Sequence, residues 1–405
     1  MMDKLIFFTK APNLTNCKTR LNSFLTDQER YDLMVKLIKE NFNKALATRK
    51  DIIIYYDGDI KDISFIDGKK KAQEGDDLGY RMNNAIFDQI EDQNKVVLIG
   101  TDLENLTSQD IKEAFDKLDE YDLVISPTID GGFGLIGQKA KTDFLTGIEY
   151  STSTVLEEIL IRAKKFGKSY YLLPTIRDID DMKDMIVAEF DNEDIKLLGA
   201  GEYNINYKLD DLVIRVNLAS QMNLGDKQLK YEYDALKVLE KSNVTPKVYD
   251  YYENGKYLPK SYLTMEYVEG RPLSYQEDME IAARLLSSVH NLKADFSNFI
   301  YAAKPFRAMY EEFISMFSHY KSYEKKDKYV EEKILSFLSM AEESGLDEKI
   351  ENPCIINTEL NNRNFIIGDR PVIIDWEKPI IGECEQDLAP VSYTHLRAHE
   401  TLRYL

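Results

Sequence analysis

The sequence predicts an α/β protein of two domains, a doubly wound and mostly parallel sheet followed by an α+β domain. Three observations lead to this fold class. In the first half, short apolar runs alternate with segments of helical periodicity, which is typical of parallel strands joined by crossover helices. In the second half, hairpin-like strands come first and helices dominate later. Between the halves, a polar and acidic segment marks the change of pattern.

The length and composition of the chain agree with two domains. A chain of 405 residues is too long for one ordinary core, and its 43% hydrophobic residues are enough for two. We expect a first domain over residues 1–187, a linker over 188–196 and a second domain over 197–390.

The first half alternates strands and helices in the order that a doubly wound sheet requires. The segment 96–99 is wholly apolar, as a parallel strand buried on both faces should be. Thr26 and Glu29 predict a capping box that opens one helix, and Thr154 and Glu157 open another. We expect strands at residues 5–8, 52–56, 96–99, 123–125, 133–137 and 170–173, and helices at 26–47, 78–90, 108–118 and 154–165.

The second half begins with a hairpin, in which strands at residues 205–209 and 212–216 flank a turn at Asp210 and Asp211. Strands first and helices later indicate an α+β domain. The other expected elements are a helix at 227–241, a strand at 261–268, mainly helices over 276–343, and a late hairpin of strands 365–367 and 372–374.

The charge and the cysteines exclude several classes of protein. A net charge of −19 argues against a general nucleic-acid binder and against binding to anionic membranes, but a local basic loop with Mg²⁺ still permits nucleotide substrates. The three cysteines lack metal-ligand spacing and fit a reducing cytoplasm. No signal-peptide core and no run of roughly 18 apolar residues is present. We therefore expect small-molecule partners in the cytoplasm, and protein partners are left open.

Charged residues follow the predicted strands of the first half. Asp102 comes directly after strand 96–99, and ligands of open α/β sheets collect at the carboxyl edge of the strands. A carboxylate there can hold Mg²⁺ against a diphosphate, although the same residue could simply cap the next turn. The cations that bracket the first strand-to-helix loop would bind phosphates, and they are Lys10, Lys18 and Arg20.

Two flexible turns add further candidates in the first half. The turn at residues 75–81 opens a helix and offers Asp77 and Arg81 for ligand binding. At residues 130–132, two glycines let the backbone approach a ligand beside the carboxylate of Asp130, which we assign to catalysis. The alternative for these glycines is an ordinary tight turn.

Polar residues of the second half recur at the spacing of a kinase active site. Glu359 is followed five residues later by Asn364, and Asp375 comes after the next strand. In that arrangement the first carboxylate accepts the proton of the acceptor hydroxyl, and the amide and the second carboxylate hold Mg²⁺.

A second group of residues lies earlier in the second half, around its first hairpin. Gly199 and Gly201 precede the hairpin, and Arg215 lies in its second strand. Glu232 lies on the next helix, so an Arg–Glu pair could clamp nucleotide phosphates. The alternatives are a plain turn for the glycines and two unrelated surface charges for the pair.

The order of motifs in the first half is specific enough to suggest a family. The runs that match are residues 8–12, 18–21, 77–82, 99–102, 130–137, 151–152 and 178–180. Together they resemble the bacterial GT-A-type glycosyltransferases often found in arsenosugar biosynthesis clusters, which are related in fold to sugar-phosphate nucleotidyltransferases. The resemblance implies a divalent metal, Mg²⁺ or Mn²⁺, and transfer of a glycosyl group from a nucleotide sugar.

The second half, over about residues 197–389, resembles the aminoglycoside phosphotransferase and choline kinase family, which has a protein-kinase-like fold. The kinase-type spacing and a hinge-like run at residues 265–270 carry this resemblance, which implies ATP as the phosphate donor. The family's His-Gly-Asp is Asn357-Thr358-Glu359 here, and glutamate is one methylene longer than aspartate. Because a displacement of order 1 Å can cost ~10²-fold in rate, this favours Mg-nucleotide binding over fast phosphoryl transfer.

Three hypotheses about function follow. The first is a bifunctional transferase, with glycosyl transfer from a nucleotide sugar in the first domain and phosphorylation of a small alcohol or amino-alcohol in the second. The second is nucleotidyl transfer by the first domain onto a phosphate ester that the kinase half supplies. The third is a glycosyltransferase fused to a pseudokinase that binds nucleotide without transferring phosphate.

The last residues break the pattern of the chain. The segment 391–405 contains two of the four histidines, and residues 392–401 resemble a translated sequencing-adapter run. We expect a non-native tail there and a truncated second domain, with an ordinary surface tail as the alternative.

Overall fold

A computed structural model describes residues 2–388 except 92–93, 221, 223 and 347. The chain forms two compact units, each with its own core. Unit 1 comprises Met1–Ile195 with Gly255–Pro259, and unit 2 comprises Lys196–Asn254 and Lys260–Leu405. The predicted tail at 391–405 lies outside the described residues.

Unit 1 is built on a seven-stranded sheet with the strand order β3-β2-β1-β4-β6-β5-β7. Its neighbouring strands pair in parallel except for β6, which pairs antiparallel with both β4 and β5. The strands are β1 Lys4–Lys10, β2 Asp51–Asp57, β3 Lys69–Ala72, β4 Val96–Ile99, β5 Leu123–Pro127, β6 Phe133–Gln138 and β7 Tyr170–Leu172.

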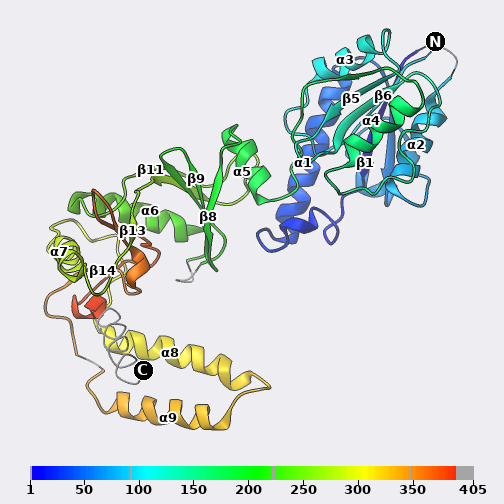
Figure 1. Ribbon diagram of the computed structural model, residues 1–405. Helices are drawn as coiled ribbons and strands as arrows, with labels where there is room; N and C mark the ends of the chain where they lie inside the picture. Colours follow the sequence, from blue (N-terminus) through cyan, green and yellow to red (C-terminus); the bar gives the residue numbers. More distant parts are fainter. Residues whose placement is uncertain (1, 92–93, 221, 223, 347, 389–405) are drawn as a thin grey trace, which may run out of the picture. The chain divides into compact units, whose positions relative to one another are not determined.

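Helices cover both faces of this sheet (Figure 1). Alternate side chains of each strand point to opposite faces, so Phe7 joins one core and Ile6 the other. Helices α1 and α3 bury their apolar residues in the first core, and α2 and α4 in the second. The helices of unit 1 are α1 Asp27–Leu46, α2 Leu78–Gln89, α3 Ser108–Lys117, α4 Val155–Lys165 and α5 Met182–Phe190.

The predicted doubly wound sheet is confirmed in unit 1. Thr26 and Glu29 form the predicted capping box at the start of α1. Thr154 precedes α4 but makes no side-chain capping bond, because its backbone is already helical and not extended. The sequence offered no sign of β3, which is a lysine-rich edge strand. It also gave no sign of α5, which makes the first three residues of the expected linker 188–196 helical.

Unit 2 contains a five-stranded antiparallel sheet with the order β11-β12-β10-β9-β8. A three-stranded sheet β13-β15-β16 and a β14-β17 pair complete its strands. Their bounds are β8 Lys196–Ala200, β9 Asn204–Leu209, β10 Leu212–Asn217, β11 Val248–Tyr252, β12 Tyr262–Glu266, β13 Arg271–Pro272, β14 Cys354–Ile356, β15 Phe365–Ile367, β16 Val372–Ile373 and β17 Ile380–Gly382.

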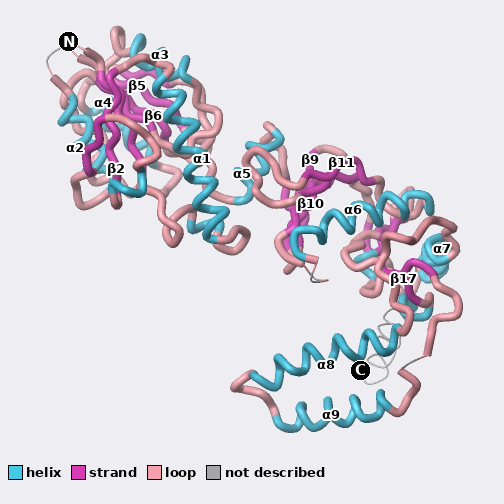
Figure 2. The backbone as a smooth tube through the Cα atoms, turned by 180° about the vertical axis from the view of Figure 1, so that it is seen from behind, coloured by secondary structure: helices cyan, strands magenta, loops and turns pink. Residues whose placement is uncertain are grey.

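Helices of unit 2 are α6 Gln228–Leu239, α7 Met279–His290, α8 Pro305–Ser322 and α9 Lys328–Glu342. Side chains of α6 and α7 meet the strands in one core around the fully buried Trp376. Helices α8 and α9 lie side by side as a helical hairpin (Figure 2). Across the described part of the chain, no helix combines the length and the apolarity that a membrane crossing demands.

The α+β order of unit 2 is confirmed, including both predicted hairpins, β9–β10 and β15–β16. The glycine-containing run at residues 198–204, for which a plain turn was the alternative to ligand binding, begins in the exposed edge strand β8. Strands β11, β13, β14 and β17 were also missed, because segments of two to five residues carry too little periodicity to be recognised.

Candidate functional sites

The first candidate site lies at the carboxyl edge of the parallel strands of unit 1. There β1 runs in register with β2 and β4, so the ends of three strands meet. The hydroxyls of Thr9 and Thr101 lie 3.3 Å apart at this edge. Asp102 follows directly after them, as the sequence predicts.

Lys18 links two carboxylates at this edge. Its Nζ lies 2.9 Å from Asp102 Oδ2 and 3.1 Å from Asp180 Oδ1, and Arg20 donates to the other Asp180 oxygen at 2.9 Å. The Lys18 backbone is left-handed, with φ of 42°, where the 3₁₀ turn Thr19–Leu21 begins. Burial lowers the pKa of Lys18, but Asp102 and Asp180 outweigh this and raise it. Lys18 therefore stays charged and holds residues 84 and 162 positions away.

Asp178 adds a carboxylate that Lys18 does not neutralise. Its backbone pairs with Leu103 next to Asp102. Burial, followed by the negative charges of Asp102, Asp180 and Asp130, raises the pKa of Asp178 to about 7. A cavity of about 300 Å³ opens beside it, with Arg20 and Asp130 among its lining residues. The site thus contains a carboxyl group that is ready to ionise when a cation arrives.

The turn at Asp130 is tight because two segments of unit 1 approach each other closely there. Gly131 has φ of 89°, and a Cβ there would lie 2.2 Å from the carbonyl oxygen of Ser153. Asp130 accepts hydrogen bonds from the Thr128 hydroxyl at 2.5 Å and the Gly132 N–H at 3.1 Å. The glycines therefore serve a close approach between two segments of unit 1, and Asp130 remains exposed at the cavity.

The other predicted residues of unit 1 do not join the ion pairs that Lys18 makes with Asp102 and Asp180. Asp77 caps α2 by accepting from the Tyr80 N–H at 2.9 Å. Arg81 binds Asp57 at 3.0 Å, and Lys10 is exposed and in register with Asp57 at the same sheet edge. Within the described ranges, no three His, Cys, Asp or Glu side chains are arranged to hold a metal on their own.

The second candidate site is a cavity of about 540 Å³ in unit 2. Its walls come from β8, β10, the hinge-like run at 265–270 and the late hairpin. Asn364 and Asp375 of the kinase-type set therefore meet here, and Glu359 does not line this cavity. A Cβ added at Gly199 would meet nothing within 4 Å, which leaves the rim of the cavity open. Lining residues include Gly199, Gly201, Arg215, Met265, Val268, Asn364 and Asp375.

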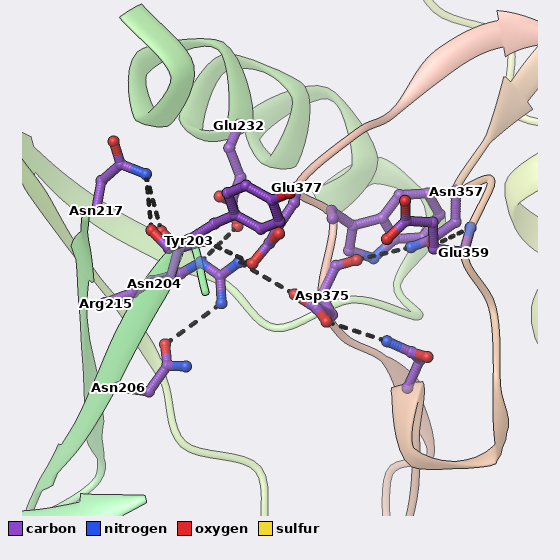
Figure 3. Close-up of polar contacts among 12 residues, drawn as sticks. Tyr203, Asn204, Asn206, Arg215, Asn217, Glu232, Asn357, Glu359, Asp375 and Glu377 are labelled. Atoms are coloured by element: carbon purple, nitrogen blue, oxygen red, sulfur yellow. Dashed lines mark hydrogen bonds and ion pairs between the residues drawn. The ribbon is translucent and has the colours of Figure 1, made fainter. Parts of the chain in front are cut away.

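Arg215 is the centre of this site (Figure 3). Its Nε lies 2.9 Å from Glu232, and one terminal nitrogen lies 3.1 Å from Asp375 and 2.5 Å from Glu377. The predicted Arg–Glu pair therefore exists, and it belongs to a larger cluster. Burial lowers the pKa of Arg215, but Glu232, Asp375 and Glu377 together raise it.

Glu232 is the most buried carboxylate of this cluster. It is 2% exposed, and its Oε2 has no hydrogen-bond partner in the described structure. Arg215 Nε and Glu232 Oε1 lie 2.9 Å apart and form an ion pair. Burial raises the pKa of Glu232 to about 7 in spite of the arginine.

The kinase-type residues converge next to this cluster. Asn364 Nδ2 donates to Asp375 Oδ2 at 3.3 Å, and Asn357 Nδ2 donates to the Asp375 carbonyl at 2.9 Å. Thr358 and Asp375 both have positive φ, at 73° and 64°. Such conformations are costly for residues other than glycine and gather at functional sites.

Glu359 faces a separate cavity of about 790 Å³. Helix α8 forms one wall of it with Phe306, Met309 and Glu312. Lys378 lies opposite and pairs with Glu312 at 2.9 Å. Unit 2 thus has one cavity at Arg215 and Asp375 and another at Glu359.

A fully buried carboxylate, Asp387, holds the turn that carries Glu359. It accepts the backbone N–H groups of Asn357 and Thr358, each at 2.9 Å. His290 Nε2 lies 3.0 Å from its other oxygen. Asp387 is 0% exposed.

Several residues of these sites were not assigned from sequence. Asp178 and Asp180 lie in the run 178–180 that carries the family resemblance, but no role was predicted for them. Glu377, two positions after Asp375, was not predicted either. The acidic run at 178–181 was a signal for the first two. Asp387 and His290 carried no signal, because only the fold brings them to Asn357.

Two family models match the chain. The model described as "Uncharacterized protein conserved in bacteria (DUF2064)" matches residues 45–152. The model described as "Phosphotransferase enzyme family" matches residues 194–404. The first match lies in unit 1, and the described part of the second lies almost wholly in unit 2.

Individual proteins are similar to each half. The 2-phospho-L-lactate guanylyltransferase of Methanocaldococcus jannaschii is 32% identical over 162 residues, which are 39% of this chain and 69% of that protein. A protein provisionally named a nucleotide-diphospho-sugar transferase, from Desulfovibrio desulfuricans G20, is 26% identical, with a TM-score of 0.45 over 48% of this chain and 89% of its own. The choline kinase LicA of Streptococcus pneumoniae is 18% identical, with a TM-score of 0.37 over 51% of this chain and 71% of its own.

Proposed function

Because the chain belongs to the phosphotransferase enzyme family through residues 194–404, and through its first half to the family of the 2-phospho-L-lactate guanylyltransferases, we propose that it is a bifunctional transferase that phosphorylates a small alcohol and then transfers a nucleotidyl group to the product. Both families are transferases. The substrates and the order of the two steps are our proposal.

Nucleotidyl transfer in unit 1 is supported first by the 32% identity to a guanylyltransferase. In this reaction a phosphate-ester oxygen attacks the α-phosphorus of a nucleoside triphosphate, and pyrophosphate leaves. Lys18 and Arg20 offer two cations at the carboxyl edge of the sheet, where the triphosphate would lie. Their positive charges would stabilise the charge that develops on the phosphate oxygens.

The carboxylates of unit 1 suit a divalent cation. Mg²⁺ is usually held by one or two carboxylates together with substrate phosphates, so a preformed cage of three ligands is unnecessary. Asp102, with 41% of its side chain exposed, and Asp178, whose pKa is raised to about 7, would provide such a pair. A metal bound there would polarise phosphate oxygens.

The test of this step is incubation with GTP and a panel of phosphate esters. Release of pyrophosphate, with the nucleotidyl group retained on the ester, supports the proposal. Because guanylyl transfer is the reaction named for the relatives, GTP is the first triphosphate to try.

Glycosyl transfer from a nucleotide sugar is the second candidate for unit 1. The order of motifs from residue 8 to residue 180 favours it. Release of a nucleoside diphosphate from a nucleotide sugar, with no pyrophosphate from GTP, would establish glycosyl transfer and exclude the first candidate.

Phosphoryl transfer in unit 2 is supported by Arg215, Asn364 and Asp375, which line one cavity, and by Glu359, which lines a separate cavity. Arg215 would bind the phosphates of ATP. The carboxylate of Asp375 and the side-chain amide oxygen of Asn364 would hold Mg²⁺. Bound there, the metal would neutralise charge on the transferred phosphate. Glu359 would accept the proton of the acceptor hydroxyl as its oxygen bonds to the γ-phosphorus and ADP leaves.

The acceptor cavity selects against anions. Its lining includes four glutamates and one lysine, and Glu312 already pairs with that lysine. A second carboxylate or phosphate on the acceptor would be repelled, whereas a neutral or amine-bearing alcohol would not. We therefore expect this chain to prefer an alcohol of a different charge from the lactate derivative named for its relatives.

A pseudokinase is the second candidate for unit 2. The nitrogen atoms of Arg215 already face protein carboxylates and Asn206, so no part of the guanidinium is reserved for phosphate. Incubation with ATP, Mg²⁺ and a panel of neutral and amine-bearing alcohols decides between the two. Phosphate ester that forms with the wild type and is lost on Asp375→Ala supports the kinase, and tight ATP binding without any ester supports the pseudokinase.

A further inference from the structure

Five charged side chains among the described residues line the cavity at Arg215 and Asp375, and four of them already have an oppositely charged partner. Arg215 pairs with Asp375 and Glu377. Glu266 pairs with Arg370, which lies outside the lining. The remaining charged residue of the lining is Arg363.

Arg363 is a cation without a partner in the part of the chain that the structure describes. Its side chain is exposed, and its guanidinium makes no hydrogen bond, ion pair or ring contact with any of those residues. Its backbone, in contrast, is fixed. The Arg363 N–H donates to Asn361 Oδ1 at 2.9 Å in the 3₁₀ turn η5, Asn362–Asn364. An ordered turn therefore presents an uncommitted positive charge to the cavity.

The same turn places Arg363 beside the residues that would hold Mg²⁺. Asn361 and Asn364 form a capping box, in which the Asn361 N–H donates to Asn364 Oδ1 at 2.9 Å. Asn364 in turn donates to Asp375 at 3.3 Å. A metal held by Asn364 and Asp375 would bridge the phosphates of a nucleotide. The side chain of the preceding residue, Arg363, therefore starts at the phosphate end of the cavity.

The two arginines of the lining differ in what an incoming phosphate would displace. Each guanidinium nitrogen of Arg215 lies within 3.4 Å of a carboxylate or of the Asn206 amide, so a phosphate must displace a protein contact there. At Arg363 the phosphate displaces only water. An arginine also offers parallel N–H groups that match two oxygens of one phosphate. Since ATP with one Mg²⁺ is still an anion, a free cation in a lining rich in carboxylates should contribute strongly to its affinity.

We propose that Arg363 is a phosphate-binding residue of unit 2, which contacts the phosphates of ATP directly while Arg215 is held by its carboxylates. This rests on the proposed function of unit 2, in the nucleotide binding that an active kinase and a pseudokinase share. It adds a cation that the kinase-type spacing does not identify, and it lets nucleotide bind before Arg215 exchanges partners.

The test measures nucleotide binding by unit 2 within the whole chain. Because Trp376 is the sole tryptophan and is buried in unit 2, its fluorescence in urea titrations assigns stabilisation by a ligand to that unit. With Mg²⁺ present, Arg363→Met should weaken ATP binding by about tenfold or more, the size of a charge-assisted hydrogen bond. Arg363→Lys keeps the charge and loses the fork, so we expect a loss of about threefold.

A series of ligands separates a phosphate contact from damage to the cavity. Arg363→Met should weaken ADP binding about as much as ATP binding, and it should leave adenosine binding within about twofold of the wild type. The loss for ADP should persist with EDTA in place of Mg²⁺, because the proposed contact does not pass through the metal. Equal losses for adenosine and ATP, or a loss that requires Mg²⁺, would overturn the proposal.

Arg284→Met is the matched control. Arg284 lies on α7, is exposed and lines neither cavity of unit 2, so its substitution should leave ATP affinity as in the wild type. Without nucleotide, neither Arg284→Met nor Arg363→Met should move the urea midpoint, because both change exposed side chains. Arg363→Gln is a second neutral variant in case Arg363→Met does not fold, and it should show the same tenfold loss. An affinity for ATP within twofold of the wild type in the folded variant would refute the role of Arg363.

The same titrations distinguish failure of this inference from failure of the proposed function. If ATP stabilises the wild type and Arg363→Met equally, the role of Arg363 is refuted and the proposed function stands. If ATP with Mg²⁺ does not stabilise unit 2 of the wild type, nucleotide binding is refuted and the role of Arg363 falls with it. ATP binding without phosphate transfer selects the pseudokinase, and the affinity of Arg363→Met still decides the role of Arg363.

Discussion

The two units place a basic side chain among carboxylates in different ways. In unit 1, Lys18 lies between Asp102 and Asp180, whose side chains are 41% and 35% exposed. In unit 2, Arg215 lies among Glu232, Asp375 and Glu377, and the arginine and Glu232 are almost completely buried. The lysine acts as one charged point, whereas the arginine directs different nitrogens to different partners.

The difference shows how burial decides what each site can do. The carboxylates beside Lys18 are partly exposed, and burial with neighbouring carboxylates raises the pKa of Asp178, so we propose that a cation can enter. The Arg215 cluster is closed, and phosphates must compete with carboxylates that the arginine already binds. We therefore propose that unit 1 can receive a metal without breaking the contacts of Lys18, whereas Arg215 in unit 2 would have to exchange partners if nucleotide binds.

The largest effect on activity should come from removing Asp375, the proposed metal ligand of unit 2. Asp375→Ala removes both the proposed ligand for Mg²⁺ and a partner of Arg215, so we expect phosphoryl transfer to fall by about 10³-fold or more. ATP-dependent formation of a phosphate ester measures this. Nucleotidyl transfer by unit 1 on a supplied phosphate ester serves as the internal control and should be unchanged. A variant that retains a tenth of the activity would contradict the role of Asp375.

The next effect compares the two basic residues directly. Arg215→Met should lower the free energy of unfolding of unit 2 by about 3–5 kcal/mol, because it leaves buried carboxylates unpaired. Lys18→Met should cost unit 1 less, about 1–2 kcal/mol, because solvent reaches Asp102 and Asp180.

One residue makes this comparison measurable. Trp376 is the sole tryptophan of the chain and is buried in unit 2, so its fluorescence reports the unfolding of that unit. Urea titrations followed by fluorescence should shift for Arg215→Met and not for Lys18→Met, and far-ultraviolet circular dichroism should detect both. Equal losses in the two variants would show that burial does not distinguish the sites.

A smaller effect concerns pH and Asp178. Its pKa of about 7 lies above the ordinary value of 3.8, so between these values the folded state holds a proton that the unfolded state has released. The stability of unit 1 therefore falls as pH rises from about 4 to 7. Asp178→Asn should remove this loss and be more stable than the wild type at pH 8 by about 1–2 kcal/mol, less than the full shift implies because the side chain is partly exposed.

Urea titrations at pH 5 and pH 8 measure this dependence. The gain in free energy of unfolding from Asp178→Asn should shrink towards pH 5. It should also decrease on addition of Mg²⁺, because Mg²⁺ would favour the ionised carboxylate of the wild type. A gain that is the same at both pH values would mean that Asp178 titrates normally.

The smallest effect tests the two predicted helix starts in unit 1. Thr26→Ala removes a capping box and should cost about 1 kcal/mol, whereas Thr154→Ala removes no capping bond and should cost less than about 0.5 kcal/mol. Circular dichroism at increasing urea measures both variants. Equal costs would indicate that the Thr26 contacts contribute nothing.

The fold was largely predictable because the main elements have strong local periodicity. The strand at 96–99 and the helix that starts at Thr26 are examples, and each appears within one or two residues of its expected bounds. The short edge strands β3 and β8 were not predictable, since few residues and exposed positions leave no pattern.

The sites were predictable only where residues are close in sequence or match a known spacing. Asn364 meets Asp375 as the kinase-type spacing implied, whereas Glu359 lines a separate cavity. The predicted Arg215–Glu232 pair is formed, and Lys18 reaches Asp102. Asp77 and Arg81 do not join Lys18, because local capping and the Asp57 pair engage them. Asp387 lies 30 residues from Asn357, and its role depends on tertiary contacts alone.

The most direct test of two linked transfers is one ³¹P NMR time course with a neutral or amine-bearing alcohol, ATP, GTP and Mg²⁺. We predict that a phosphate monoester appears first and is then joined to the nucleotidyl group through a phosphoanhydride bond, which gives a diphosphate diester as pyrophosphate accumulates. Asp375→Ala should block the first signal but still convert a supplied monoester, and Asp102→Asn should stop at the monoester. Formation of the diester without a monoester intermediate, or no monoester from any alcohol, would contradict the account.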